Sequence, residues 1–310
     1  MNDSYLEYPG RGYGQDHDFY DWRMVQKRPK LKWDGDTKVA VCLIVPLEFF
    51  PLNPSGSPFK HPGAMKTPYP DLRHFTVRDY GNRVGVFRIL EALEAHNISA
   101  TFAVDGEVAR RYPCLVNRIG TAEHCIAVHG LSTDKIHHSG LTGDMEVAWI
   151  IEAEQSFGSE DYPSGFNDNP SGWMSPARNQ SPRTLELLAA RGYRYCLDWE
   201  MDQVPVTAQT GAGNITLIPN SYELSDFTLL HIRGQSGDSW LAQIGASIDL
   251  LLEEYARYGS QMLGLTLTPY VIGQPFRIRA LRMLLDHIRD TDGVEVLTAD
   301  AIDKQFREQA

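Results

Sequence analysis

The amino-acid sequence predicts an α/β fold, a deformed (β/α) barrel of about seven strands in a single domain. Apolar strand-like runs alternate with helical patterns over most of the 310 residues, and this alternation is typical of parallel strands joined by crossover helices. Residues 39–47 form a continuous apolar run, as expected for a strand that is covered on both faces. The number of strand–helix units fits a barrel better than a short open sheet.

Each expected strand is a short apolar run bounded by polar, glycine or proline residues, and each expected helix has apolar residues at helical spacing. The expected strands are residues 39–47, 99–104, 125–128, 193–197, 216–218, 227–232, 262–268 and 294–297, with a further strand flanked by Trp173 and Arg178. The expected helices are residues 85–93, 108–119, 145–157, 182–191, 241–258 and 277–290. Ser181 and Pro182 are typical of an N-cap and a first helical position.

Two segments fall outside this alternation. Residues 1–32 are rich in Tyr, Gly, Asp and Pro and are assigned to an N-terminal arm, whereas residues 33–310 are assigned to the barrel. Residues 49–82 are expected to form one long connection that is rich in Pro and Gly. Connections of that length tend to carry function.

Composition and charge exclude several classes of partner. The net charge is −11 and no long run of Lys or Arg occurs, whereas nucleic-acid binding needs a concentrated basic surface. No apolar run approaches the length that crosses a bilayer, and the polar start of the chain is unlike a secretory leader. The four cysteines lack metal-ligand spacing and disulfide-scaffold density. We therefore expect a cytoplasmic protein that acts on a small molecule, with no nucleic-acid or membrane partner.

Three residues at predicted strand ends are candidates for catalysis. Sites in parallel barrels lie at the C-terminal ends of the strands. Glu48 ends the first strand, His129 follows residues 125–128, and Asp198 follows residues 193–197. A carboxylate in such a position can serve as a general base or acid, and a histidine can donate or accept a proton. We therefore assign catalysis to Glu48, His129 and Asp198.

Other polar and aromatic residues near the strand ends are candidates for substrate binding. An arginine there can clamp a carboxylate or an amide oxygen through two N–H groups, although either Arg178 or Arg83 could equally bridge loops to Asp198 or Glu48. The substrate-binding candidates are Arg83, Trp173, Arg178, Asp202, His231, Arg233, Thr268 and Tyr270. His137 and His138 are adjacent, which favours a polar turn over a metal site because neighbouring side chains rarely point at one ion.

Several motifs in a fixed order extend from about Trp33 to Ala301. They are Trp33-Asp34-Gly35, Glu48, residues 80–90 (YGNRVGVFRIL), residues 100–104 (ATFAV), Val128-His129-Gly130, residues 171–176 (SGWMSP), residues 195–198 (YCLD) with Asp202 and Pro205, and residues 269–277 (PYVIGQPFR). With these motifs the chain resembles the polysaccharide-deacetylase (NodB-homology) superfamily, and within it the allantoinase-like branch, which acts on small cyclic amides. The resemblance implies a NodB-like deformed (β/α) barrel and a homo-oligomer, either a tetramer or a dimer.

The resemblance also implies a metal site that this sequence does not complete. Metal-using members bind zinc or a similar ion through an aspartate and two histidines in an HxxxH arrangement. His129 matches the first histidine, but the second position falls on Thr133, and the aspartate region holds Pro46-Leu47-Glu48. The late catalytic histidine falls on Thr268. One histidine and one glutamate do not make a tetrahedral site with three protein ligands, so we expect neither a metal nor another cofactor.

The function implied by these residues is metal-independent hydrolysis of a C–N bond in a small amide or ureide. Glu48 and His129 would transfer protons, and Arg178 or Arg83 would bind an anionic oxygen. Two alternatives remain open. One is a lyase or decarboxylase that acts on a small carboxylic or aromatic acid. The other is a ligand-binding protein that has lost catalysis.

Overall fold

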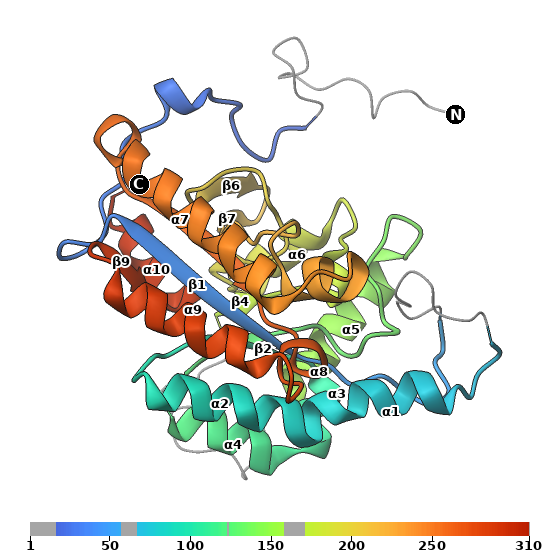
Figure 1. The fold of residues 1–310 in the computed structure, drawn as a ribbon. Helices are drawn as coiled ribbons and strands as arrows, with labels where there is room; N and C mark the ends of the chain where they lie inside the picture. The colour runs from blue at the N-terminus through green and yellow to red at the C-terminus, as the bar shows by residue number, and fades with distance from the viewer. Residues whose placement is uncertain (1–16, 57–66, 123, 158–170, 310) are drawn as a thin grey trace.

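The structure is a computed structural model that describes residues 17–56, 67–122, 124–157 and 171–309. Its described strands form one curled, nine-stranded sheet with helices packed around it (Figure 1). The strand order is β6-β7-β5-β4-β3-β2-β1-β8, and β9 pairs with β1. All pairs are parallel except β6 with β7. The expected α/β class and deformed (β/α) barrel in a single domain are confirmed, with nine described strands in place of about seven.

The strands are short except for the first and the eighth. Their bounds are β1 (Val39–Leu47), β2 (Thr101–Val104), β3 (Cys125–Val128), β4 (Gly172–Trp173), β5 (Tyr195–Cys196), β6 (Val206–Thr210), β7 (Gly213–Leu217), β8 (Gln261–Thr266) and β9 (Val294–Val296). Strand β1 pairs with three other strands. It pairs with β8 along Val39–Ile44, with β9 at its start and with β2 at its end.

Most of the helices cover the outer face of the curled sheet, and the last one packs against the residues inside the curl (Figure 1). Their bounds are α1 (Leu72–Tyr80), α2 (Val86–Ala95), α3 (Gly106–Arg111), α4 (Pro113–Thr121), α5 (Gly143–Gln155), α6 (Thr184–Ala190), α7 (Gly237–Tyr258), α8 (Pro269–Ile272), α9 (Ile278–Asp290) and α10 (Ala299–Arg307). Helix α7 illustrates the packing. Trp240, Ile244, Ile248 and Leu251 recur at helical spacing and are buried, because they form the apolar stripe that faces the sheet.

The two faces of β1 belong to two separate apolar clusters. Its odd-numbered residues, such as Val41 and Leu43, pack in the cluster beneath the outer helices. Its even-numbered residues, such as Cys42 and Ile44, pack in a smaller cluster inside the curl. The alternation follows from the two-residue period of a strand. It confirms that residues 39–47 are covered on both faces, since every residue of β1 is buried.

Several expected elements differ in the structure. Phe227–Ile232 is a π-helix and not a strand, because a short apolar run has the same composition in either state. The expected helix at 108–119 is two helices, since Pro113 cannot donate a backbone hydrogen bond and begins α4 afresh. Helix α6 begins at Thr184, two residues after Pro182.

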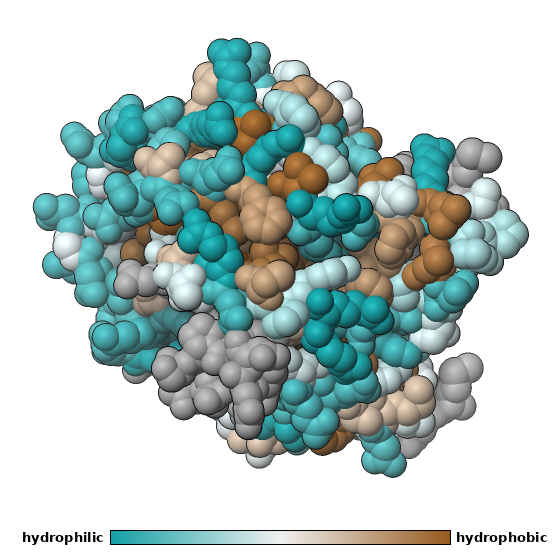
Figure 2. Space-filling model, turned by 90° about the horizontal axis from the view of Figure 1, so that it is seen from below, coloured by the Kyte–Doolittle hydropathy of each residue, from teal (hydrophilic) through white to brown (hydrophobic). Residues whose placement is uncertain are grey.

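The expected long connection at 49–82 contains helix α1. It continues into a π-helical turn at Gly81–Gly85 before α2 begins. The sheet also has an antiparallel strand, β6, that the sequence reading did not include. Among the described residues, no helix is both long and apolar enough to cross a bilayer. Viewed from below, apolar residues gather near the centre of the surface among hydrophilic ones (Figure 2).

The curl brings the chain after β7 against β8. The backbone N–H of Ser221 donates to the carbonyl of Gly264 at 2.9 Å, and Ser221 forms an isolated parallel bridge with Leu265. Glycine is required at position 264 because a Cβ atom there would lie 2.1 Å from the carbonyl oxygen of Pro219. This close backbone contact joins the two ends of the sheet.

We predict that Gly264→Ala lowers the free energy of unfolding by about 1–3 kcal/mol, because the added methyl group must push the two backbones apart. Guanidinium unfolding measures the change. Gly143→Ala is the matched control, since its nearest contact would be 3.8 Å away, and its effect should stay within about 0.5 kcal/mol. Equal midpoints for the two variants would contradict the close contact at the seam.

Candidate active site

A cavity of about 160 Å³ lies at the C-terminal ends of the strands, the edge where parallel barrels hold their sites. Strand ends contribute the side chains of Pro46, Glu48, His129, Met174, Thr266 and Thr268. Loops and short helices contribute Arg178, Tyr222, Phe227 and Tyr270 among others. The cavity is therefore sized for a small molecule.

The strand period decides which side chains enter the cavity. Pro46 and Glu48 continue the even-numbered series of Cys42 and Ile44, which faces the inside of the curl. His129 follows Ala127 on the same face of β3. Residues on one face of a strand recur at every second position. Glu48 and His129 therefore point inward for the same reason that the interior cluster forms.

Glu48 and His129 form a close pair in this cavity. The Nε2 atom of His129 lies 3.4 Å from Oε1 of Glu48. The Nδ1 atom lies 2.9 Å from the carbonyl oxygen of Met174, and because a carbonyl only accepts, Nδ1 carries a proton. Burial lowers the pKa of His129, but the hydrogen bond and charge of Glu48 outweigh it, so the net pKa is raised. The pair therefore favours an imidazolium whose Nε2–H faces a carboxylate.

Asp105 holds the backbone directly after Glu48, and the sequence reading missed it. It caps α3 by accepting the N–H of Val108 at 2.7 Å, and it accepts the N–H of Phe49 at 2.5 Å. Burial raises the pKa of Asp105 well above its usual value, although these backbone hydrogen bonds oppose the change. Asn82 adds a hydrogen bond from Nδ2 to the carbonyl of Glu48 at 2.9 Å. The end of β1 is thus fixed from two sides.

Arg178 enters the cavity from a strained turn. Ala177 and Arg178 have φ values of 55° and 53°, in the left-handed region that costs about 1–2 kcal/mol for each residue with a side chain. The Nη1 atom of Arg178 donates to the carbonyl of Asn220 at 2.6 Å, and the guanidinium lies over the ring of Tyr222. Such a conformation persists only where the surroundings hold it.

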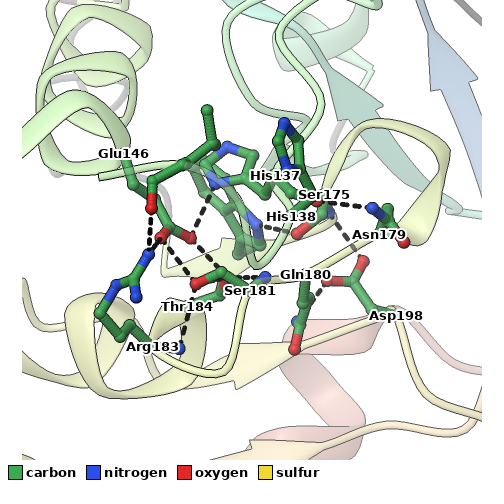
Figure 3. Close-up of polar contacts among 12 residues, drawn as sticks. His137, His138, Glu146, Ser175, Asn179, Gln180, Ser181, Arg183, Thr184 and Asp198 are labelled. Carbon is green, nitrogen blue, oxygen red and sulfur yellow. Dashed lines mark hydrogen bonds and ion pairs between the residues drawn. The ribbon is translucent and has the colours of Figure 1, made fainter. Parts of the chain in front are cut away.

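Asp198 holds both ends of this turn and does not line the cavity. Its carboxylate accepts the N–H of Ser175 at 2.7 Å and the side-chain amide of Gln180 at 2.5 Å (Figure 3). Gln180 in turn accepts the indole N–H of Trp199 at 2.9 Å. Asp198, a candidate for catalysis from the sequence, therefore lies where it positions Arg178.

A buried polar cluster anchors the chain just beyond the turn (Figure 3). Glu146 accepts hydrogen bonds from Ser181 and Thr184, each at 2.6 Å, and Nδ1 of His137 lies 3.1 Å from its carboxylate. Asn179 donates to the carbonyl of His137 at 2.6 Å. His137 is fully buried, which corrects its interpretation as part of a polar turn, whereas the adjacent His138 is exposed.

The remaining sequence candidates lie outside the cavity lining. Trp173 is fully buried in the core, with its ring 5.4 Å from that of Tyr193. Arg83 is exposed and lies 3.6 Å from Asp79. The others are Asp202, which pairs with Arg28, His231, whose ring lies 5.1 Å from that of Phe227, and Arg233, which pairs with Glu223. Phe227 lines the cavity in place of His231 because the segment is a π-helix and not a strand.

Thr268 and Tyr270 do line the cavity, and a buried carboxylate fixes the backbone of this segment through hydrogen bonds. Asp226 accepts the N–H of Thr268 at 2.8 Å and that of Ile272 at 3.2 Å. Burial raises the pKa of Asp226 to about 7, although these backbone hydrogen bonds lower it. Asp226 was not a sequence candidate, and its position before an apolar run was the available signal.

The side chains present do not fit the metal site that the resemblance implies. The hydroxyl of Thr133 donates to the carbonyl of Phe49 at 2.9 Å. Among the described residues, no three His, Cys, Asp or Glu side chains converge on one point. Glu48 and His129 provide two donors, fewer than a typical zinc site uses.

Comparisons with known proteins agree with this architecture. Residues 75–196 match the model of the polysaccharide deacetylase family. A protein of Schizosaccharomyces pombe described as "Putative polysaccharide deacetylase" is 22% identical over 294 residues, which cover 87% of this chain and 90% of the relative.

Two solved structures share the fold. One is described as a "probable Polysaccharide deacetylase from Pseudomonas aeruginosa PAO1" and has a TM-score of 0.79 at 22% identity, covering 91% of this chain and 95% of the other. The other is "Puue Allantoinase", with a TM-score of 0.77 at 21% identity, covering 93% and 98%. The expected similarity to both kinds of protein is confirmed at the level of fold.

We predict that Glu48→Gln lowers the pKa of His129 by about one pH unit or more, because the carboxylate charge that favours the imidazolium is lost. A histidine whose pKa is raised on folding adds stability below its unfolded value, about 6.5, and loses it as the pH rises through the folded value. An NMR titration of His129, assigned with His129→Gln, measures the pKa. An unchanged pKa in Glu48→Gln would contradict the pairing.

We also predict that Glu146 stabilises the fold in a pH-dependent way. Burial raises the pKa of Glu146, but hydrogen bonds from His137, Ser181 and Thr184 outweigh it and lower the pKa to about 2. The stability it adds is therefore complete above its unfolded pKa and is lost as the pH falls toward 2. Glu146→Gln should cost about 1–3 kcal/mol at neutral pH.

Unfolding midpoints between pH 2 and pH 7 test this prediction, since the loss of stability on acidification should be smaller in Glu146→Gln. Glu152→Gln on the same helix is the control, because Glu152 forms an exposed pair with Arg110 and should change stability by less than about 1 kcal/mol. If wild type and Glu146→Gln lost the same amount of stability between pH 7 and pH 2, the pH-dependent role of Glu146 would be contradicted.

Proposed function

We propose that this chain, whose residues 75–196 match the model of the polysaccharide deacetylase family, hydrolyses a C–N bond of a small amide or ureide without a bound metal. The observation that carries the proposal is the Glu48–His129 pair, which lies beside Arg178 in one small cavity. A carboxylate, a protonated imidazole and a guanidinium together supply a base, an acid and an oxyanion partner. The family and the allantoinase fold support C–N hydrolysis.

In the proposed reaction Glu48 removes a proton from a water molecule, and the water oxygen attacks the carbonyl carbon of the substrate. The carbonyl oxygen becomes an oxyanion that the Arg178 guanidinium stabilises. As the C–N bond breaks, Nε2 of His129 donates its proton to the leaving nitrogen. The proton held by Glu48 then passes across the 3.4 Å gap to His129, which restores both groups.

The metal-free part of the proposal rests on the donor set. Thr133 and Thr268 stand where the resemblance places histidines, and their backbone or side-chain groups contact Phe49 and Asp226. Neither is a usual ligand for zinc. Without a metal to lower the pKa of water, the base must be a side chain, and Glu48 is the carboxylate that lines the cavity.

A ligand-binding role without catalysis is the second candidate function. The replacement of two expected histidines by Thr133 and Thr268 favours it. The two functions differ in one measurement, because both predict binding of a small molecule and only the first predicts turnover.

We predict that the wild-type protein hydrolyses a member of a panel of small amides and ureides, chosen by a thermal-shift screen for binding. Glu48→Gln should lower kcat by about 100-fold or more, since it removes the general base. Arg178→Met should lower kcat by a similar factor because the oxyanion loses its partner. Product analysis by mass spectrometry measures turnover and distinguishes added water from loss of carbon dioxide.

Arg118→Met is the matched control for the arginine variant, because Arg118 lies on α4 and pairs with Glu94 at the surface. Its turnover should equal that of wild type. Binding without turnover for every compound that shifts the melting temperature would favour the second candidate. Activity that is lost on chelation and restored by Zn²⁺ would contradict the metal-free part and leave C–N hydrolysis standing.

A further inference from the structure

A buried arginine that packs on Tyr270, a residue of the cavity lining, has no counter-charge among the described residues. Arg78 lies on α1 and is 3% exposed. Its guanidinium carbon lies 4.8 Å from the ring centre of Phe50 and 5.4 Å from that of Tyr270. The Nη1 atom donates a long hydrogen bond of 3.4 Å to the carbonyl of His74. The Nε and Nη2 atoms have no hydrogen-bond partner, and no ion pair to Arg78 is present in the part of the chain that the structure describes.

A buried cation in this state is unfavourable. Aromatic rings stabilise a guanidinium through its faces, and they leave the N–H groups in its plane without acceptors. Removing a charge from water is costly unless it is both paired and hydrogen-bonded. The neighbouring Arg88 on α2 shows the usual solution, since it donates to the hydroxyl of Tyr80 and, at 2.9 Å, to the carbonyl of Gly273.

The two unpartnered nitrogens have a specific geometry. Nε–H and the N–H of Nη2 lie along one side of the guanidinium and point in nearly the same direction. This edge matches the two oxygens of a carboxylate, which it binds through two parallel hydrogen bonds. The two N–H donors of Arg78 that lack an acceptor could therefore bind one carboxylate.

Arg78 does not itself line the cavity, but two of its neighbours lie at or near the cavity wall. Tyr270 lines it, and Phe50 follows Glu48 by two residues. Burial raises the pKa of the Tyr270 phenol, the charge of Glu48 raises it further, and the charge of Arg78 opposes both. Glu48 and Arg78 thus lie within electrostatic range of the same ring.

We propose that Arg78 binds a carboxylate of the substrate, so that the compound acted on is a small amide or ureide with a carboxylate group, such as an N-acyl or N-carbamoyl amino acid. The substrate class rests on the proposed function, whereas the carboxylate site does not. Glu48, His129 and Arg178 would face the C–N bond, and Arg78 would hold the acidic end. Two charged anchors also fix which end of the molecule faces the base.

The test is the thermal unfolding of the full chain with sodium acetate, with sodium chloride at the same ionic strength, or with neutral acetamide. Acetate should raise the melting temperature of wild type and of Arg88→Met, each relative to its own baseline, because a ligand that binds the native state stabilises it. Chloride and acetamide should not. Acetate should not raise the melting temperature of Arg78→Met. Arg78→Lys should bind acetate at least about tenfold more weakly, because a lysine side chain cannot donate two parallel hydrogen bonds to one carboxylate.

The unliganded variants give a second readout. If the charge of Arg78 is unpaired in the free protein, Arg78→Met should unfold at the same or a higher temperature than wild type. If Arg78 instead stabilises the fold by packing between the two rings, Arg78→Met should unfold at a lower temperature than wild type. Arg88→Met should unfold at a lower temperature, because the side chain of Arg88 forms hydrogen bonds that the variant loses. An acetate shift that persists in Arg78→Met, or one that is lost in Arg178→Met instead, would overturn the proposal. So would equal shifts with acetate and chloride, which indicate an adventitious ion only.

The same measurement separates this inference from the proposed function. Glu48→Gln should keep its acetate shift even though it loses hydrolysis. Failure of hydrolysis with an intact acetate shift would leave the carboxylate site standing and reject the enzyme. Hydrolysis of neutral amides, combined with no acetate shift in any variant, would support the enzyme and reject the carboxylate site.

Discussion

Burial of β1 on both faces is the constraint on which the rest of the site depends. The strand is the hub of the sheet and pairs with β2, β8 and β9. Because its two faces belong to different apolar clusters, a slip of one residue would exchange every side chain between them. The register is therefore fixed by burial, and the same alternation directs Glu48 into the cavity. The placement of the candidate base is a consequence of the core.

Buried carboxylates around the cavity act mainly on the backbone. Asp105 holds the chain after Glu48, Asp198 holds the turn that presents Arg178, and Asp226 holds Thr268. Each accepts at least one backbone N–H, and such bonds offset part of the cost of burying a carboxyl group. Ala177 and Arg178 remain in a left-handed conformation because these contacts over-determine the turn. These buried carboxylates thus fix the positions of the groups that line the cavity.

The electrostatics of the cavity are set by the Glu48–His129 pair, with Thr133 and Thr268 at the positions where the resemblance implies histidines. His129 pairs directly with Glu48, and the effect of Glu48 on its pKa outweighs that of burial, so the pKa is raised. A metal ion would instead require a neutral histidine as its ligand. The unpaired guanidinium of Arg78 adds positive charge on the Tyr270 side. The anionic small molecule that we propose as substrate would be attracted by this charge.

The alternation of strands and helices, the two-sided burial of residues 39–47, and the positions of Glu48 and His129 at strand ends could all be predicted from local sequence pattern. These depend on local periodicity, which a sequence displays directly. The three-dimensional packing was needed to show that Phe227–Ile232 is a π-helix, that Asp198 does not line the cavity, and that Arg78 has no counter-charge among the described residues. These features depend on partners far apart along the chain, and local pattern carries no information about which distant groups will meet.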